Sequence, residues 1–173
     1  FRPKVIFFIS FLISFSYTQD ITNGCDLPDS ETTGYLHLTA DGAVFYKSPE
    51  NIGGWQFDVD GASVNTASGG DTAENGLFTQ SLGGTVLAFS LGGGFIPAGC
   101  GTLTELTLSG EATGLSSIVV SNQSASAIYF EYFNPIFGCL DNTACNYNAD
   151  VTVDDGSCLY DDCNGVCGGS AEE

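Results

Sequence analysis

The side chains with the most chemistry available to them are gathered in the C-terminal stretch, residues 138–169. Five of the seven cysteines and six aspartates alternate there, without Lys, Arg or His. Thiols can form disulfides or bind zinc, and carboxylates can bind divalent cations. The stretch has little apolar surface, so a hydrophobic core cannot hold it. It must be held by cross-links, by bound cations or by packing onto a neighbour.

Disulfide bonding is the favoured use of the thiols. Zinc binding around Cys163 and Cys167 is the alternative, which the absence of a nearby His disfavours. Because seven is odd, at least one cysteine is free, bonded to another chain or bonded to a segment outside this sequence. Cys25 and Cys100 are candidates for a bond to each other, and the five tail cysteines permit two bonds. The disulfide candidates are Cys25, Cys100, Cys139, Cys145, Cys158, Cys163 and Cys167.

Calcium is the cation that the acidic tail would suit. Oxygen-bearing side chains alternate and are followed by an Asp-Asp-Gly turn, which resembles a calcium loop. An EF-hand register fits only in part, because Val151 falls at the glycine position and Ser157 at the glutamate position. The alternative is a solvated turn in which Asn and Asp cap nearby backbone groups. The candidate ligands are Asn146, Asn148, Asp150, Asp154 and Asp155.

Catalysis is not expected. His37 is the single histidine and has no nucleophile motif near it, so no nucleophile and base can be paired. Aromatic side chains could instead stack on sugars, but Trp55 alternates in phase with Phe57, which favours a place in the core. Asn122 begins a glycosylation sequon in an expected loop. The tyrosines considered for a sugar platform are Tyr35, Tyr46, Tyr129 and Tyr132.

The charge balance excludes nucleic acid as a partner. Lys and Arg total 3 against 21 Asp and Glu, giving a net charge of −18. An acidic surface repels phosphate backbones and suits divalent cations or a salty medium.

The first 19 residues are expected to be a secretory leader. A basic start precedes an apolar run over residues 5–15, which is too short for a stable membrane span, and small residues follow. If it is retained, the run is expected to act as a strand lent to a neighbouring subunit. The residues of that assembly strand are Val5, Phe7, Ile9, Phe11 and Ile13. Either way the protein is expected outside the cell or at its surface.

Short β-prone runs recur every eight to twelve residues between 35 and 133, separated by Gly-rich or Asp-Gly turns. Period-two alternation at this spacing predicts an all-β fold, an antiparallel sandwich of about nine strands in the jelly-roll or cohesin-like class. We expect a hairpin at Asp60-Gly61 and an apolar inner face carrying Leu87, Phe89 and Leu91. The expected divisions are 1–19 (leader or strand), 20–34 (lead-in loop), 35–135 (sandwich) and 136–173 (Cys/Asp-rich module).

Two segments resemble known families. The motifs GGWQFDV, VLAFSL and IPAGCGTLTELTLSG, within residues 35–133, resemble strands of the cohesin-like β-sandwich family. The chain departs from that family at Asp60-Gly61-Ala62, where a Tyr-Asp-Pro usually follows. Residues 138–158 are similar to the repeat GCTDxxACNYNxxAxxDDGSC of secreted microbial surface proteins. That resemblance implies that residues 138–158 form a module of the kind found beside adhesion or stalk domains, as part of an appendage.

The sequence therefore predicts a non-enzymatic secreted structural subunit that assembles with copies of itself into a filament or surface appendage. Strand donation, disulfides and calcium would brace the assembly. The alternative is an adhesion module of a larger secreted protein that binds a carbohydrate or a partner domain.

Overall fold

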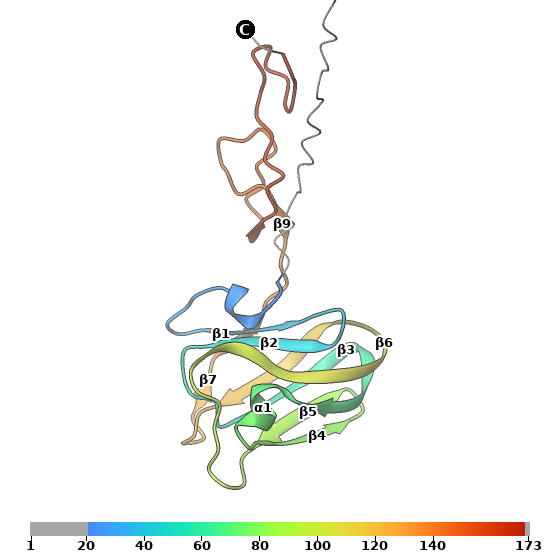
Figure 1. Ribbon diagram of the computed structural model, residues 1–173, viewed down its shortest axis with the longest axis vertical. Helices are drawn as coiled ribbons and strands as arrows, with labels where there is room; N and C mark the ends of the chain where they lie inside the picture. Colours follow the sequence, from blue (N-terminus) through green and yellow to red (C-terminus); the bar gives the residue numbers. More distant parts are fainter. Residues whose placement is uncertain (1–20, 172–173) are drawn as a thin grey trace, which may run out of the picture. The chain divides into compact units, whose positions relative to one another are not determined.

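The computed structural model describes residues 21–171, and Figure 1 shows its secondary structure. The predicted leader, its cleavage and the assembly strand lie outside these residues. Two compact units form, residues 21–134 and residues 135–171. The first contains η1 (Gly24–Asp26), α1 (Gly70–Glu74) and the strands β1 (Gly34–Leu38), β2 (Ala43–Ser48), β3 (Gly54–Ser68), β4 (Phe78–Leu82), β5 (Thr85–Phe89), β6 (Gly99–Ser121), β7 (Ala127–Ile128) and β8 (Phe130–Tyr132). The second contains β9 (Phe137–Gly138) and β10 (Val153–Asp154).

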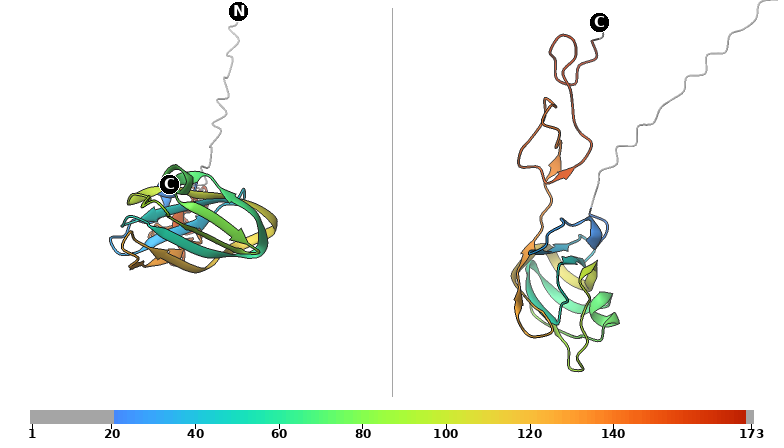
Figure 2. Two further views of the ribbon diagram at one scale, coloured as in Figure 1. Left: turned by 90° about the horizontal axis from the view of Figure 1, so that it is seen from below. Right: turned by 90° about the vertical axis from the view of Figure 1, so that its left-hand side faces the viewer.

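The eight strands described in the first unit join in the order β4-β5-β3-β6-β2-β1-β8, with β7 added beside β6. All pairs are antiparallel except β1 with β8, which is parallel. Side chains from every strand of the path except β4 share one buried core, so the connected strands curve around it (Figure 2). The mostly β fold predicted from the alternation is confirmed.

The expected hairpin at Asp60-Gly61 is wrong. Both residues lie inside β3, which runs from Gly54 to Ser68 without a turn and pairs with β6 on both sides of them. The register shifts between Asp60 and Ala62, and Gly61 has a φ of 81°. The Asp-Gly pair therefore makes a bulge, which bends the long strand instead of ending it.

Trp55 lies in the core, as its alternation with Phe57 predicts. The two rings stack with centroids 5.0 Å apart, and Trp55 is 3% exposed. Its indole N–H donates to the Thr72 hydroxyl at 3.1 Å, so the buried donor is satisfied. Thr72 belongs to α1, a helix too short to give a helical period and absent from the sequence prediction. The hydrogen bond fixes α1 against β3.

The lead-in residues are held to β2 and β6 by three kinds of contact. Cys25 forms a disulfide with Cys100 in β6. The ammonium of Lys47 donates to the carbonyl of Leu27 at 2.8 Å and pairs with the Asp29 carboxylate at 2.6 Å. A Cβ at Gly24 would collide with the backbone of β2 and β6, so only glycine permits this close approach.

The second unit has a short parallel pair, β9 with β10, and two disulfides. Cys139 bonds to Cys158 and Cys145 bonds to Cys167. Its buried apolar residues are Cys139, Ala144 and Val151. So small a core agrees with the expectation that this segment needs cross-links to hold its shape.

No helix in residues 21–171 is long and apolar enough to cross a membrane.

Candidate functional site

An apolar, solvent-exposed face lies on four neighbouring strands, β4, β5, β3 and β6. Strand pairing puts one set of alternate residues on the side away from the core. We call this set the outer face. Its three rows across the strands are Phe78–Phe89–Gly54–Ser121, Gln80–Leu87–Gln56–Val119 and Leu82–Thr85–Asp58–Ser116.

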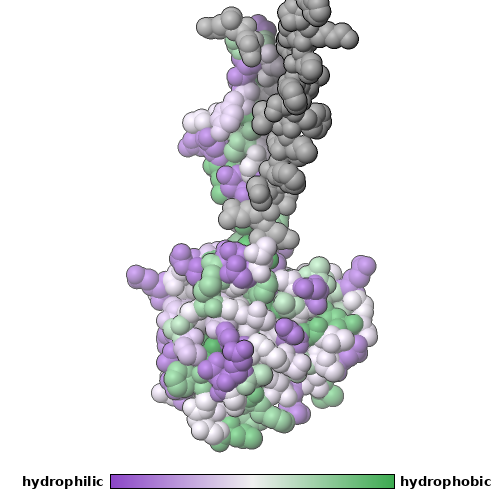
Figure 3. Space-filling model, viewed as in Figure 1, coloured by the Kyte–Doolittle hydropathy of each residue, from purple (hydrophilic) through white to green (hydrophobic). Residues whose placement is uncertain are grey.

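The apolar members of the outer face are strongly exposed. Leu82 is 87% exposed, Val119 58%, Phe78 49% and Phe89 39%. In Figure 3, hydrophobic residues appear along the lower margin of the first unit, where Figure 1 places β4, β5 and the loop that follows β5. Scattered exposed apolar residues are ordinary, but several on adjoining strands are typical of a binding surface.

The inner face predicted for β5 is wrong. The structure buries Val86 and Ala88, leaves Leu87 half-buried, and leaves Phe89 and Leu91 exposed. Small residues point inward because Trp55 pairs with Ala88 and Phe57 pairs with Val86, and those two large rings already fill the core beside β5. The larger side chains of β5 are therefore directed to solvent, where they belong to the outer face.

The turn between β4 and β5 is built from two glycines. Gly83 has a φ of 64°, a conformation that other residues rarely adopt. The Gly83 carbonyl accepts from the Val64 amide at 2.9 Å, and the Gly84 carbonyl accepts from the Val59 amide at 2.8 Å. These bonds tie the tip of the β4–β5 hairpin to the bent part of β3.

The outer face is electrically neutral over most of its area. Residues 75–104, which include β4 and β5, contain no charged residue in a chain with 21 acids. Asp58 and Asp60 mark its acidic border. The Thr85 and Ser117 hydroxyls hold the pKa of the Asp58 carboxyl below its ordinary value, so Asp58 stays ionised. Thr85 donates to this carboxylate at 2.5 Å.

Two hollows accompany the sheet. One of about 360 Å³ lies on the outer face and is lined by Gln80, Ser81, Leu82, Thr85 and Leu87. A wider groove of about 650 Å³ lies where the turn after β1 meets the middle of β6, and Asp41 and Glu111 line it. A hydrogen bond from the Thr39 hydroxyl, together with the main-chain amides of Asp41 and Ala43, holds the pKa of the Asp41 carboxyl below its ordinary value.

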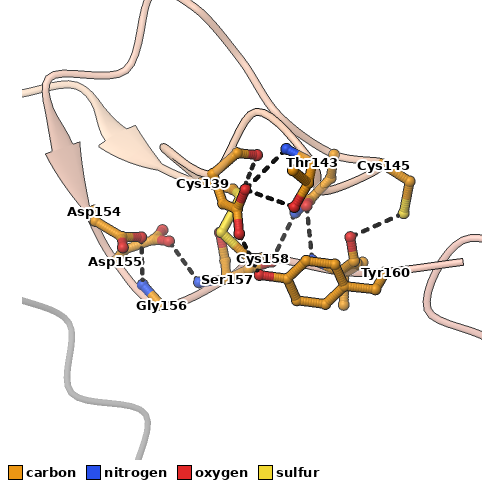
Figure 4. The surroundings of a disulfide bond; sticks show 12 residues. Cys139, Thr143, Cys145, Asp154, Asp155, Gly156, Ser157, Cys158 and Tyr160 are labelled. Carbon is orange, nitrogen blue, oxygen red and sulfur yellow. Dashed lines mark hydrogen bonds between the residues drawn. A yellow bond between two sulfur atoms is a disulfide. The ribbon is translucent and has the colours of Figure 1, made fainter.

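The predicted calcium ligands are used mainly as caps of local turns. Asp154 accepts from the Gly156 amide at 3.1 Å and Asp155 from the Ser157 amide at 2.9 Å, as Figure 4 shows. The Ser157 hydrogen bonds lower the pKa of the Asp155 carboxyl.

Two asparagines of the same set also bond to backbone. Asn148 accepts from the Asp150 amide at 3.0 Å, and Asn146 accepts from the Leu159 amide at 2.7 Å. Within residues 21–171, the one group of three acidic, His or Cys atoms close enough for a metal is Cys145, Asp161 and Cys167. The sulfurs of Cys145 and Cys167 already share a disulfide. The structure therefore does not bring Asp150, Asp154 and Asp155 together.

Cys163 is the cysteine that the odd count leaves without a partner inside this chain. It is exposed and is the free thiol among the seven cysteines, all of which lie in the described part of the chain. Its neighbours form a tight loop in which the Asp162 amide donates to the Val166 carbonyl at 3.0 Å. The Asp162 carboxylate in turn accepts from the Val166 amide at 3.0 Å.

The other candidates are spread over the first unit. Tyr46, like Trp55, is buried, and its hydroxyl donates to Asp71 at 2.7 Å; burial, together with Asp71, raises the pKa of Tyr46 well above its ordinary range. Tyr129 is exposed and donates to Glu131 at 2.7 Å. His37 lies 3.0 Å from the Phe133 carbonyl. Burial thus removes Trp55 and Tyr46 from the set considered for sugar stacking, whereas Tyr35, Tyr129 and Tyr132 lie on or beside the paired strands β1 and β8.

The remaining candidate rings and the sequon are also accounted for. Tyr132 stacks with His37 at a centroid distance of 6.3 Å, and Tyr35 packs edge-on against Phe133. Asn122 is half-buried, and its side-chain oxygen caps its own loop by accepting from the amides of Ser124 and Ser126, both at 3.0 Å.

Comparison with known proteins gives two similar solved structures. A non-cellulosomal cohesin from the hyperthermophilic archaeon Archaeoglobus fulgidus is 14% identical, with a TM-score of 0.42 over 60% of this chain and 86% of that one. A chain from a type I cohesin–dockerin complex of Clostridium thermocellum is 13% identical, with a TM-score of 0.37 over 62% and 92%. Both agree with the predicted resemblance to cohesins. No family model and no curated protein matches the sequence.

The strand order and the disulfides describe the chain without reference to either structure. They define a mostly β domain with three disulfides in the described residues. The outer face was not predicted from the sequence: Leu87 and Phe89 were named, but they were expected on an inner face. Two signals could have revealed this face: the uncharged run in an acidic chain, and β5, which has apolar residues at consecutive positions.

Proposed function

We propose that this protein is a non-catalytic extracellular binding module that holds a partner protein on the outer face. The observation that carries the proposal is an uncharged apolar set on the four strands of the outer face: the exposed Phe78, Leu82, Phe89 and Val119, with the half-buried Leu87 among them. Burying such side chains against a partner removes apolar area from water, at about 25 cal/mol per Å². Three disulfides support an oxidising, extracellular setting.

The partner that fits has a flat apolar patch with Lys or Arg along one border. Its apolar part would cover Leu87 and Phe89, and its cations would meet Asp58 and Asp60 at the acidic border. Opposite charges at the rim speed association and reject acidic competitors. A protein partner is favoured over a sugar on this face because none of the aromatic residues considered for sugar stacking belongs to its three rows.

A photo-crosslinking amino acid at position 89 tests the proposal in the native secreted fraction, with the same label at position 111 as a control on another surface. We expect one protein to be captured from position 89 alone. The captured protein, once purified, should bind the module, and Leu87→Lys should weaken that binding at least about tenfold. Equal capture from both positions, or capture of polysaccharide alone, would contradict the proposal.

A second candidate is the filament subunit predicted from the sequence, in which copies of the chain are joined through residues 5–15 and through Cys163. The exposed free thiol of Cys163 favours it, because an unpaired cysteine on a secreted protein can link two chains. The native material, run on a denaturing gel without reductant, should then show a covalent dimer that disappears in Cys163→Ser, because each chain has one free thiol and can form one such link. A monomer band alone without reductant would exclude the covalent form of this assembly.

A further inference from the structure

Strand β4 has an open edge. It pairs with β5 on one side, and no described strand pairs with it on the other. Proteins commonly protect such an edge with Lys, Pro or a bulge, since unpaired main-chain groups invite another strand. The β4 sequence Phe-Thr-Gln-Ser-Leu has no charge and no Pro, and its register with β5 is regular. This edge is therefore ready to accept a strand.

The hairpin decides which groups of β4 point to the open edge. Leu82 and Thr85 close a two-residue turn, so their main-chain groups face each other across the hairpin. Main-chain groups alternate sides along an antiparallel strand. Those of Phe78 and Gln80 therefore also face β5, and those of Thr79 and Ser81 face outward.

We propose that two copies of this chain pair edge to edge through β4, antiparallel and centred on Gln80. This register places Thr79 of one copy opposite Ser81 of the other, so the residues with outward main-chain groups meet. It also places Phe78 of each copy opposite Leu82 of the other. Along β4 the side chains are apolar, hydroxyl, amide, hydroxyl and apolar in turn. Because this pattern is the same in both directions, two antiparallel copies of β4 are complementary about a two-fold axis.

The charge distribution favours a second copy of the chain as the partner of the open β4 edge. Two copies each carry a net charge of −18 and repel each other over most of their surfaces. Residues 75–104 are uncharged, so β4 is a place where identical chains can meet without bringing carboxylates together. At this contact Phe78 and Leu82, which are 49% and 87% exposed, would gain apolar cover.

Edge pairing also extends the proposed function without depending on it. The sheets of the two copies would become continuous, with the two outer faces side by side. A partner protein with two binding patches could then engage both copies, and its overall affinity would exceed that for one copy.

Sedimentation equilibrium of the purified protein, with Cys163→Ser in every sample, tests the pairing. We expect a dimer with a dissociation constant in the micromolar range and a monomer for Gln80→Lys, which sets two like charges against each other across the axis. Val119→Lys adds the same charge to the outer face three strands away and should remain dimeric. A monomer at concentrations up to about 1 mM, or a Val119→Lys variant that is as monomeric as Gln80→Lys, would overturn the proposal.

A cysteine at the axis gives a readout that a folding defect cannot imitate. Opposed residues of a pair without mutual hydrogen bonds lie about 4.5 Å apart at Cα, which a disulfide can span. Gln80→Cys in the Cys163→Ser background should therefore form a covalent dimer on mild oxidation, whereas Val119→Cys should not. Absence of the Gln80→Cys dimer, or equal dimer from both variants, would overturn the register.

Discussion

Phe78 and Phe89 face each other across the β4–β5 hairpin on its solvent side, with ring centroids 5.9 Å apart and planes at 74°. Edge-to-face packing of this kind is favourable, yet both rings remain well exposed. An aromatic pair that the fold holds in water contributes less to folding than it could contribute to association. The exposed Phe78–Phe89 pair therefore supports a role of the outer face in binding.

Replacing Phe89 with Ser tests whether this side chain belongs to the surface or to the core. We expect the free energy of unfolding to change by less than about 1 kcal/mol, because the side chain is exposed. Binding of an apolar dye to the folded protein should fall. Urea unfolding followed by Trp55 fluorescence measures the first quantity, and dye titration measures the second. Phe57→Ala is the control and should cost about 3–5 kcal/mol, since Phe57 is fully buried. Similar losses for both variants would show that Phe89 is a core residue.

Removing the Cys25–Cys100 disulfide should destabilise the first unit. The bond closes a loop with a sequence separation of 75 residues, and its loss in Cys25→Ser with Cys100→Ser should cost about 2–5 kcal/mol. Thermal unfolding followed by Trp55 fluorescence measures the change. Cys163→Ser should leave the melting temperature as it is, because that thiol is exposed and unpaired. An unchanged melting temperature in the double variant would mean that Lys47 and Gly24 suffice to hold the lead-in residues.

Acid should weaken the fold through carboxyls such as Asp26. Burial alone would raise the pKa of Asp26, but four hydrogen bonds from Thr22 and Asn23 outweigh it and hold the pKa below the ordinary 3.8. The folded state therefore binds fewer protons than the unfolded state. The resulting stability is present above about pH 4 and is lost as the pH falls through the folded pKa. Urea unfolding between about pH 7 and pH 2 should show less loss for Asp26→Asn; equal losses would exclude this contribution.

Calcium binding by the second unit remains a prediction from its sequence. Clustered aspartates repel one another until a cation neutralises them, so added calcium should slow amide hydrogen exchange in residues 145–159. Asp154→Asn with Asp155→Asn should abolish that effect. Mass spectrometry of the full-length protein, in chelator and in calcium at about 10 mM, measures the exchange. Identical exchange in the two buffers would mean that these side chains serve only their turns.

The strands were predictable from alternation, but their continuity was not. Asp60-Gly61 has the composition of a hairpin turn, and only its pairing with β6 distinguishes a bulge within a strand from a turn between two strands. The face of β5 was ambiguous for a different reason. Apolar residues occupy both of its faces, and the space left beside Trp55 and Phe57 decided in favour of the smaller ones.

The candidate site was less predictable than the fold. The pairing of Cys25 with Cys100 was suggested by their isolation from the other cysteines. The spacing of the five tail cysteines could not show which one stays free, because several disulfide pairings are possible among cysteines joined by short loops. The outer face depends on which strands become neighbours, and that information is carried by contacts between residues far apart in sequence.

Amide hydrogen exchange at Thr79 and Ser81, measured as a function of protein concentration, tests the central claim most directly. The outward N–H groups of β4 have no partner strand in the single chain described here. The account predicts rapid exchange in dilute protein and protection at high concentration, with Val119 and its neighbours unaffected. Exchange of Thr79 and Ser81 that is equally fast at every concentration would contradict the assignment of the β4 edge to self-association.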